Sequence, residues 1–327
     1  MSTVYGPVPS WRLGRSLGID VLAPPKKCTF NCVYCQLGRT KIHVRGPEAL
    51  HDPLVDVEQV LRDLDETLQR LNLDTVDFVT FSGTGEPTLH PDLGTIAHAV
   101  KRRVSGVPLA LLTNASLLSR DSLRNNLSPF DLVVAKLDAG DDATLRAINR
   151  PADDALTCDA LIHALKAFQS GFRGDLALEV MLLSSTHGQV TNVVGQPLQR
   201  LVDAILAVRP AVVQLDVPYR PPSESFVQTP SPERVQLIAK ELAGVLGEDA
   251  LWVYGLHDRR GAPVSWRPRV SLERDAINLL KRRPCRDVDV AAALGIPLTA
   301  ARQLLMTLVA KNLLRTSSKD PRYYVSS

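Results

Sequence analysis

Segments typical of β-strands alternate with segments typical of α-helices through most of this chain of 327 residues. Runs of β-branched and aromatic residues mark the strands, and apolar residues at intervals of three or four mark the helices. A helix between two successive apolar strands indicates a parallel βα unit. About six such units fit into residues 1–255, which is too few for a full eight-unit barrel. The sequence therefore predicts an α/β fold, a partial (β/α)6 barrel.

The expected elements follow one another in a regular order. The expected strands cover residues 18–22, 75–81, 108–113, 131–138, 175–183, 211–217 and 251–254. The expected helices cover residues 57–71, 91–103, 117–126, 155–168 and 196–208, and one more begins after Ser231, with Pro232 at its first position. Asp56 is the expected cap of the first helix. Residues 1–17 are rich in Pro, Gly and Arg, which predicts a turn-rich arm that could bring Arg12 or Arg15 near an anionic ligand.

The C-terminal part of the chain has a different pattern. Residues 256–270 indicate a linker, and residues 271–327 predict a separate module of three helices followed by a hairpin. The expected helices cover 271–283, 287–294 and 298–311, and the expected strands cover 313–316 and 322–325. This order resembles a winged helix. The module has ten basic and five acidic residues, so it could bind phosphates. A solvated face and a protein-binding surface are the alternatives.

Three cysteines lie close together directly after the first expected strand. Cys28, Cys32 and Cys35 have the spacing Cys-x3-Cys-x2-Cys, which can bring three thiolates to one side of an inorganic cluster. A cubane cluster usually takes four cysteines, so three would leave one iron open, as in catalytic metal sites. The alternative is a zinc knuckle with His43 as the fourth ligand. Zinc sites usually have a second pair of ligands downstream, and no second Cys-x2-Cys follows here.

Polar and glycine residues lie at the ends of the next three strands. Ser82-Gly83-Thr84-Gly85-Glu86-Pro87-Thr88 follows the second strand, and its two glycines would let the backbone approach a ligand. Asn114, preceded by Thr113, ends the third strand. Lys136 and Asp138 lie two residues apart on one face of the fourth. A lysine within an apolar strand needs a partner, so Lys136 could bind a cofactor carboxylate, an acidic substrate or Asp138.

The cysteine triplet and the Gly85-Glu86-Pro87 motif together resemble the signatures of the radical SAM superfamily. The resemblance implies a 4Fe–4S cluster on the three cysteines and S-adenosylmethionine on the open iron. It further implies cofactor binding by several other residues, of which Tyr34 lies by the adenine, the glycine motif receives the methionyl amino group, and Asn114 faces the ribose or carboxylate. With Lys136, which the strand pattern suggested, the expected cofactor-binding residues are Tyr34, Gly83, Gly85, Glu86, Thr113, Asn114 and Lys136. Lys136 and Asp138 are the expected catalytic residues.

Residues 6–10, 36–38 and 217–222 are similar to one group of radical SAM proteins, which is related to the wyosine synthases that modify tRNA. This resemblance covers roughly residues 4–225. The archaeal synthases have an extra set of cysteines for a second cluster, and this chain lacks that set, since only Cys158 and Cys285 remain. The resemblance therefore implies the cofactors and the radical chemistry but not the wyosine reaction itself.

The radical SAM resemblance implies an enzyme that abstracts hydrogen from its substrate and needs an electron donor such as flavodoxin or ferredoxin. Modification of RNA or tRNA, modification of a peptide and activation of a glycyl-radical enzyme are the open alternatives. A fourth is an iron–sulfur regulator that binds DNA, although such a sensor needs no methionyl-binding motif. The net charge of +3 is small, and we expect a cytoplasmic protein without a membrane partner because no apolar run could span a bilayer.

Overall fold

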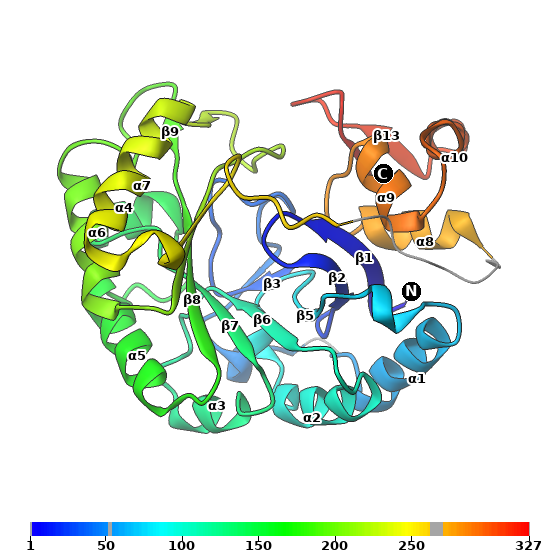
Figure 1. The fold of residues 1–327 in the computed structure, drawn as a ribbon, viewed down its shortest axis with the longest axis horizontal. Coiled ribbons are helices and arrows are strands. Elements are labelled where there is room, and N and C mark those ends of the chain that lie inside the picture. The colour runs from blue at the N-terminus through cyan, green and yellow to red at the C-terminus, as the bar shows by residue number, and fades with distance from the viewer. Residues whose placement is uncertain (1, 52–53, 262–270, 327) are drawn as a thin grey trace.

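The computed structural model describes residues 2–51, 54–261 and 271–326. Its centre is a curled sheet with the strand order β1-β2-β5-β6-β7-β8-β10-β12 (Figure 1). These strands are β1 (Val4–Ser10), β2 (Gly14–Ile19), β5 (Phe78–Phe81), β6 (Leu109–Thr113), β7 (Leu132–Lys136), β8 (Asp175–Met181), β10 (Val212–Asp216) and β12 (Leu251–Val253). All neighbours from β2 to β12 are parallel, and only β1 is antiparallel. The predicted partial α/β barrel is therefore confirmed.

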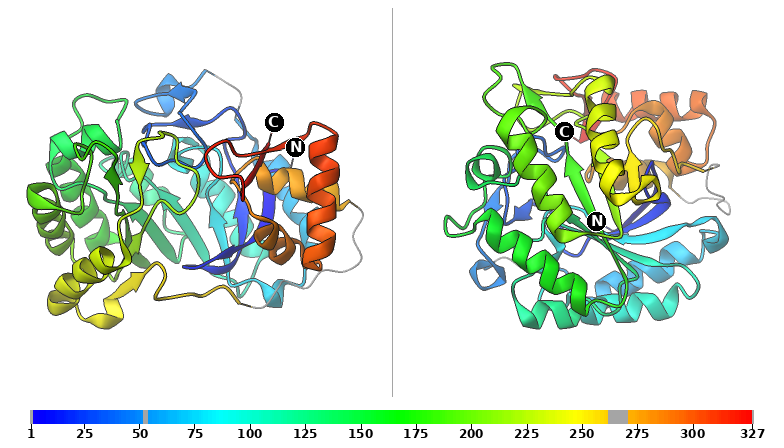
Figure 2. Two further views of the ribbon diagram at one scale, coloured as in Figure 1. Left: turned by 90° about the horizontal axis from the view of Figure 1, so that it is seen from above. Right: turned by 60° about the vertical axis from the view of Figure 1, so that its left-hand side comes forward.

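Helices cover the convex face of the sheet (Figures 1 and 2). They are α1 (Val57–Leu68), α2 (Leu93–Arg103), α3 (Asp121–Asn126), α4 (Asp142–Ile148), α5 (Cys158–Gly171), α6 (Gly195–Val208) and α7 (Pro232–Leu246). The expected caps are present, because Asp56 accepts a hydrogen bond from the Gln59 N–H at 2.6 Å and Ser231 accepts one from the Arg234 N–H at 3.3 Å. Helix α4 was not predicted, since its seven residues are too few to show an apolar stripe.

The prediction of a turn-rich arm for residues 1–17 is wrong. Residues 4–19 form the β1–β2 hairpin, whose second strand pairs with β5 in the register Leu17↔Val79. Prolines are tolerated in β1 because it is the edge strand of the sheet. An irregularity in the β1–β2 register lies between Tyr5 and Val8, where Gly6-Pro7 interrupts the pairing. Pairing with a strand some 60 residues away in the chain therefore overrides the local turn preference of this segment.

The chain also forms several short elements. They are β3 (Lys27–Cys28), β4 (Ile42–His43), β9 (Ser184–Ser185), β11 (Val227–Gln228), η1 (Pro47–Ala49), η2 (Leu73–Thr75), η3 (Pro87–Leu89) and η4 (Glu248–Ala250). Strand β3 follows β2 directly and carries the first cysteine of the triplet. The η3 turn begins directly after Glu86. Both short elements therefore lie where the expected site residues are.

The C-terminal module has the expected order of elements. Its elements are α8 (Leu272–Leu280), α9 (Asp287–Leu294), α10 (Leu298–Ala310), β13 (Leu314–Thr316) and β14 (Tyr324–Ser326). Its apolar core contains Leu279, Leu294 and Leu305, but also Tyr5 and Val8 from β1. The module therefore packs on the edge of the barrel sheet (Figures 1 and 2). The winged-helix class and the domain boundaries stay predictions, and residues 262–270 of the expected linker lie outside the described residues.

In the part of the chain that the structure describes, no single helix is long and apolar enough to cross a membrane. Helices α9 and α10 meet the length and composition criteria only as a pair, and they are bent by 112° relative to each other.

Candidate active site

A cavity of about 300 Å³ lies between the curled sheet, the cysteine loop and the C-terminal module. All of the expected metal and cofactor residues line it. They are Cys28, Cys32, Tyr34, Cys35, Gly83, Gly85, Glu86, Thr113, Asn114 and Lys136. The fold thus brings together loops that follow four consecutive parallel strands, as is usual for functional sites in βα barrels.

Each cysteine sulfur of the triplet has a nitrogen donor beside it. The Asn114 side-chain amide donates to Cys28 Sγ over 3.6 Å, and Lys26 Nζ donates to Cys35 Sγ over 3.1 Å. The third donor is the Asn149 side-chain amide, which lies 3.5 Å from Cys32 Sγ. Hydrogen-bond donors of this kind stabilise the thiolate form of a cysteine. None of the five cysteines of the described chain forms a disulfide, so the three sulfurs of the triplet are free to bind a metal cluster.

In the protein without a metal cluster, burial favours the neutral thiols and so opposes the effect of these donors. Burial, followed by the carboxyl group of Asp138, raises the pKa of Cys32 to about 11. Burial also raises the pKa of Cys28. A bound metal cluster would displace these protons, because thiolates rather than thiols are the ligands. Three free thiols on one cavity wall with N–H donors at their sulfurs therefore fit a cluster that takes one thiolate for each iron.

The zinc alternative finds no support in this arrangement. His43, its proposed fourth ligand, is exposed on β4 and does not line the cavity. Among the residues the structure describes, no three His, Cys, Asp or Glu side chains are placed to hold one metal ion. A single zinc ion needs its ligands to meet at one point, whereas the ligands of a cluster are spread around it.

The glycine loop is attached to the cysteine loop through backbone hydrogen bonds. The Glu86 N–H donates to the Lys27 carbonyl at 3.0 Å, and the Lys27 N–H donates to the Thr84 carbonyl at 3.1 Å. Gly85 lies between these bonds with a φ of +149°, and a Cβ at this position would be 1.7 Å from the Lys27 carbonyl oxygen. Only glycine allows this close approach. The two sequence motifs therefore form one wall of the cavity.

Glu86 is only 2% exposed and has four hydrogen-bond donors from the chain itself. Its Oε1 accepts from the Thr88 N–H, the Thr88 hydroxyl and the Thr113 hydroxyl, and its Oε2 accepts from the Asn114 N–H at 2.7 Å. Burial raises its pKa, although these hydrogen bonds act in the opposite direction. The carboxylate thus ties the glycine loop to the end of β6. Its predicted contact with the cofactor's amino group stays a prediction.

Glu86→Gln should weaken the binding of S-adenosylmethionine by roughly tenfold to a hundredfold, since a hydrogen bond to a charged group is lost. In addition, the side-chain amide of Gln would place an N–H₂ group opposite N–H or O–H donors that bond to a carboxylate oxygen of Glu86 in the unchanged protein. The measurement is the amount of 5'-deoxyadenosine formed against cofactor concentration, with dithionite as reductant. Glu58→Gln, an exposed change on α1, is the matched control. Superimposable curves for Glu86→Gln and the unchanged protein would remove Glu86 from the site.

The inner face of the sheet carries a connected set of charges. Arg12, at the tip of the β1–β2 hairpin, forms an ion pair with Glu179 at 2.6 Å. Lys136 Nζ lies 3.4 Å from Glu179 and 3.2 Å from Asp138. Burial raises the pKa of Glu179, but Arg12 and Lys136 outweigh it and hold the pKa at about 2. Arg15, the other arginine expected near a ligand, instead pairs with Asp77 and does not line the cavity.

The comparisons with known proteins agree with this geometry. The model of the radical SAM superfamily matches residues 22–176. A UPF0026 protein of Methanocaldococcus jannaschii, MJ1312, is 33% identical over 255 residues, which are 78% of this chain and 75% of that protein. A second UPF0026 protein, slr1464 of Synechocystis, is 37% identical over 67% of this chain and 76% of its own length. The chain belongs to the UPF0026 family of the radical SAM superfamily.

Two further kinds of similarity complete these comparisons. A protein named GTPase Obg from Brachyspira hyodysenteriae is 31% identical over 95% of this chain, which corresponds to 43% of that longer protein. A radical SAM methyltransferase structure from Sphaerobacter thermophilus has a TM-score of 0.49 at 15% identity, covering 73% of this chain and 65% of that one. The structure of anSMEcpe with bound AdoMet has a TM-score of 0.47 at 14% identity, with coverages of 72% and 64%.

Membership of the superfamily identifies the cofactors of this radical SAM protein. Enzymes of the superfamily use a 4Fe–4S cluster and S-adenosylmethionine, and they need a reductant. The chain is therefore an S-adenosylmethionine-dependent enzyme. The individual assignments of ligand and cofactor residues stay predictions from the motifs.

Asp138, one of the two expected catalytic residues, does not line the cavity of this radical SAM protein. Its side chain is fully buried behind the wall, where Oδ2 accepts from the Tyr34 hydroxyl and the Asn149 amide and Oδ1 accepts from the Met181 N–H. Lys136, the other expected catalytic residue, does line the cavity, and its Nζ lies 4.8 Å from the centre of the Tyr34 ring. Asp138 is thus placed to hold Tyr34 and Lys136 in position rather than to contact a ligand.

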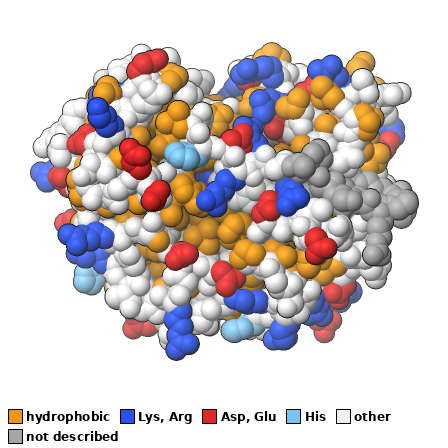
Figure 3. Space-filling view, viewed as in Figure 1, with side chains coloured by type: hydrophobic (Ala, Val, Ile, Leu, Met, Phe, Trp, Pro, Cys, Tyr) orange, Lys and Arg blue, Asp and Glu red, His pale blue; other side chains and the backbone are white. Residues whose placement is uncertain are grey.

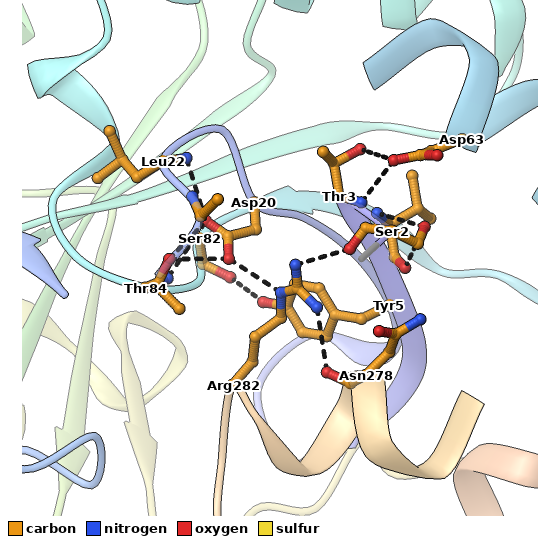
Figure 4. A network of polar contacts seen from close by, with 12 residues as sticks. Ser2, Thr3, Tyr5, Asp20, Leu22, Asp63, Ser82, Thr84, Asn278 and Arg282 are labelled. Atoms are coloured by element: carbon orange, nitrogen blue, oxygen red, sulfur yellow. Dashed lines mark hydrogen bonds and ion pairs between the residues drawn. The ribbon is translucent and has the colours of Figure 1, made fainter. Parts of the chain in front are cut away.

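A buried polar network behind the glycine loop was not predicted (Figure 4). Asp20, directly after β2, accepts from the Thr84 hydroxyl at 2.9 Å and forms an ion pair with Arg282 at 2.9 Å. A Cβ on Gly83 would lie 2.4 Å from the Asp20 Cγ, so this glycine leaves room for the carboxylate. Arg282 also donates to the Ser2 carbonyl at 2.7 Å. No sequence signal could pair Asp20 with Arg282, because 262 positions separate them.

Proposed function

We propose that this radical SAM enzyme abstracts a hydrogen atom from a substrate held in the cavity between the barrel and the C-terminal module, and that the substrate is part of an RNA. The observation that supports the proposal most directly is the lining of this one cavity. It contains the cysteine triplet, the glycine loop and the ends of β6 and β7, together with residues of the C-terminal module. A substrate bound here would lie against the cofactor-binding wall and the module at once.

The cofactors supply the chemistry when bound: the reduced cluster provides one electron, and S-adenosylmethionine provides a radical that can abstract hydrogen. The residues of the chain hold these cofactors in place. Cys28, Cys32 and Cys35 would hold the cluster, and the N–H donors at their sulfurs would favour its reduced, more negative state. The backbone of the glycine loop would face the methionyl group.

Two features of the C-terminal module support RNA as the substrate. The module has a net charge of +5, and Lys and Arg side chains gather on it beside the hollow that separates it from the barrel (Figure 3). Several of these cations are already in ion pairs, among them Arg274 with Glu66, Lys311 with Glu273 and Arg302 with Asp287. Lys281 and Arg315 are exposed and have no ion-pair partner among the described residues. Both are therefore available on the surface of the module to contact phosphates.

If the module binds RNA, replacing Lys281 and Arg315 together by Glu should weaken the binding of transfer RNA about tenfold or more, since two phosphate contacts become repulsive. Fluorescence anisotropy of labelled transfer RNA at several salt concentrations measures both the affinity and its salt dependence. The matched control is the replacement of Lys166 and Lys240 by Glu, two exposed lysines on the outer helices α5 and α7.

Several outcomes would contradict RNA as the substrate. No binding to RNA, binding that does not depend on salt, or equal losses in both double variants would move the module to the protein-binding class and favour a peptide substrate. Formation of 5'-deoxyadenosine by the anaerobic protein would exclude a regulator that turns nothing over. We propose flavodoxin or ferredoxin as the reductant, in the cytoplasm, and replacing dithionite by each donor tests this.

A further inference from the structure

Two arginines line the cavity without a carboxylate partner, and part of each guanidinium group has no hydrogen-bond partner. Arg220 follows β10, and Arg283 follows α8 in the C-terminal module. The Nε of Arg220 and both Nε and Nη2 of Arg283 are buried atoms without a hydrogen-bond partner. Leaving a buried donor unsatisfied destabilises a protein, so such groups are rare unless they serve a function.

The other cations of the cavity lining are different. Arg12 pairs with Glu179, Lys136 with Asp138 and Glu179, and Arg282 with Asp20. Among the described lysines and arginines that line the cavity, only Arg220 and Arg283 have no carboxylate partner. Asp216 is a carboxyl group of the same cavity, but its Oδ1 accepts from the Val217 N–H at 2.9 Å and it forms no ion pair with either arginine.

The side chain of Arg220 is held in place by an aromatic stack. Its Cζ lies 4.3 Å from the centre of the Tyr219 ring, which itself stacks on Tyr254 at 4.4 Å and 13°. The Tyr323 hydroxyl of the C-terminal module donates to the Tyr219 carbonyl at 2.9 Å. A guanidinium that is already fixed loses little freedom when it binds a ligand. Arg220 and Tyr254 both stack on the ring of Tyr219. The unpartnered N–H groups of Arg220, rather than a ring face, are therefore what this stack offers to a ligand.

The backbone beside Arg283 is also fixed. Cys285, two residues further along, exchanges backbone hydrogen bonds with Tyr324 at 3.2 and 2.8 Å. Arg282, the preceding residue, is anchored to Asp20 in the barrel (Figure 4). Arg283 is therefore held at the cavity by contacts on both sides of it. One arginine comes from the barrel and the other from the module.

We propose that Arg220 and Arg283 bind an oxyanion of the substrate, a phosphate or a carboxylate group, at the side of the cavity where the barrel meets the C-terminal module. The planar guanidinium, with its fixed set of N–H donors, matches the oxygens of such groups. This inference rests on the proposed function, since it names the chemistry by which the substrate of that site is recognised. An anion bound here would satisfy the unpartnered donors and would join the two parts of the chain.

The test uses the full-length protein with its cluster reconstituted under anaerobic conditions. Its melting temperature is measured against the concentration of inorganic phosphate, and separately of acetate, with chloride keeping the ionic strength constant. We expect a saturable rise with at least one of the two anions, and Arg220→Gln and Arg283→Gln should each raise its half-saturation concentration about tenfold or more. Arg220→Lys and Arg283→Lys keep the positive charge but lose the planar set of N–H donors. Their half-saturation concentrations should therefore lie between those of the unchanged protein and the glutamine variants. Arg102→Gln, an exposed arginine on α2, is the matched control and should respond like the unchanged protein.

Each outcome decides something. A response to phosphate assigns the site to a phosphorylated substrate, and a response to acetate alone assigns it to a carboxylate. No response to either anion, or the same response in the glutamine variants and in Arg102→Gln, would overturn the proposal. A response that disappears at saturating S-adenosylmethionine would also overturn it, because the arginines would then bind the cofactor's own carboxylate. None of these readings requires turnover, so failure of the anion site is distinguishable from failure of the proposed radical reaction.

Discussion

Replacing Cys28, Cys32 and Cys35 together by Ala should abolish the iron–sulfur cluster and all cleavage of S-adenosylmethionine. Each iron of a cubane cluster needs a ligand, and the described chain offers no other cysteine on the cavity wall. Anaerobically prepared protein should bind about four irons and show a charge-transfer absorption that air bleaches, and the variant should show neither. Iron content, the absorption spectrum and the yield of 5'-deoxyadenosine are the measurements.

The two remaining cysteines supply the matched controls. Cys158 is buried on α5 with its sulfur 3.5 Å from the Ala139 carbonyl, and Cys285 is buried in the core of the C-terminal module. Cys158→Ala and Cys285→Ala should keep the cluster. Retention of the cluster in the triple variant would refute the ligand assignment, and tight zinc without iron would restore the zinc alternative.

Arg282→Met should have the largest effect on stability, a loss of about 3–5 kcal/mol in the free energy of unfolding, because it leaves the Asp20 carboxylate buried without its counter-charge. Both side chains of this pair are only 1% exposed. Asp20 also accepts the hydrogen bonds that hold Thr84 in the glycine loop (Figure 4). We therefore expect weaker binding of S-adenosylmethionine as well. Urea unfolding gives the loss of stability, and the formation of 5'-deoxyadenosine against cofactor concentration gives the loss of affinity.

A second ion pair between the module and the barrel provides the comparison. Arg274 pairs with Glu66 of α1, and both side chains are about half exposed. Arg274→Met should therefore cost at most about 1 kcal/mol. Combining Arg282→Met with Asp20→Asn removes the buried charge and should recover part of the loss. Equal losses in Arg274→Met and Arg282→Met would show that burial of the Asp20–Arg282 pair is not what makes it important.

The local pattern of the sequence was enough to predict much of the barrel and the cavity wall. The periodicity of the apolar residues indicated the sheet strands from β5 to β12 and most helices, and the caps at Asp56 and Ser231 depend on side chains that act within three residues. The cysteine triplet and the Gly85-Glu86 motif follow neighbouring parallel strands. Because such strands end at the same edge of a sheet, their order along the chain already placed the two motifs together.

Only the tertiary structure decided how the two ends of the chain complete this site. The proline-rich start becomes the β1–β2 hairpin because β5 offers a partner for its second strand, and the tip of this hairpin brings Arg12 to Glu179. Arg282 reaches Asp20 because the module packs its core against Tyr5 and Val8 of β1. Each of these contacts joins residues that are far apart in the chain. Periodicity and capping act over a few residues, so they determined the elements and the motifs of this protein, whereas long-range packing determined the charges that surround its cavity.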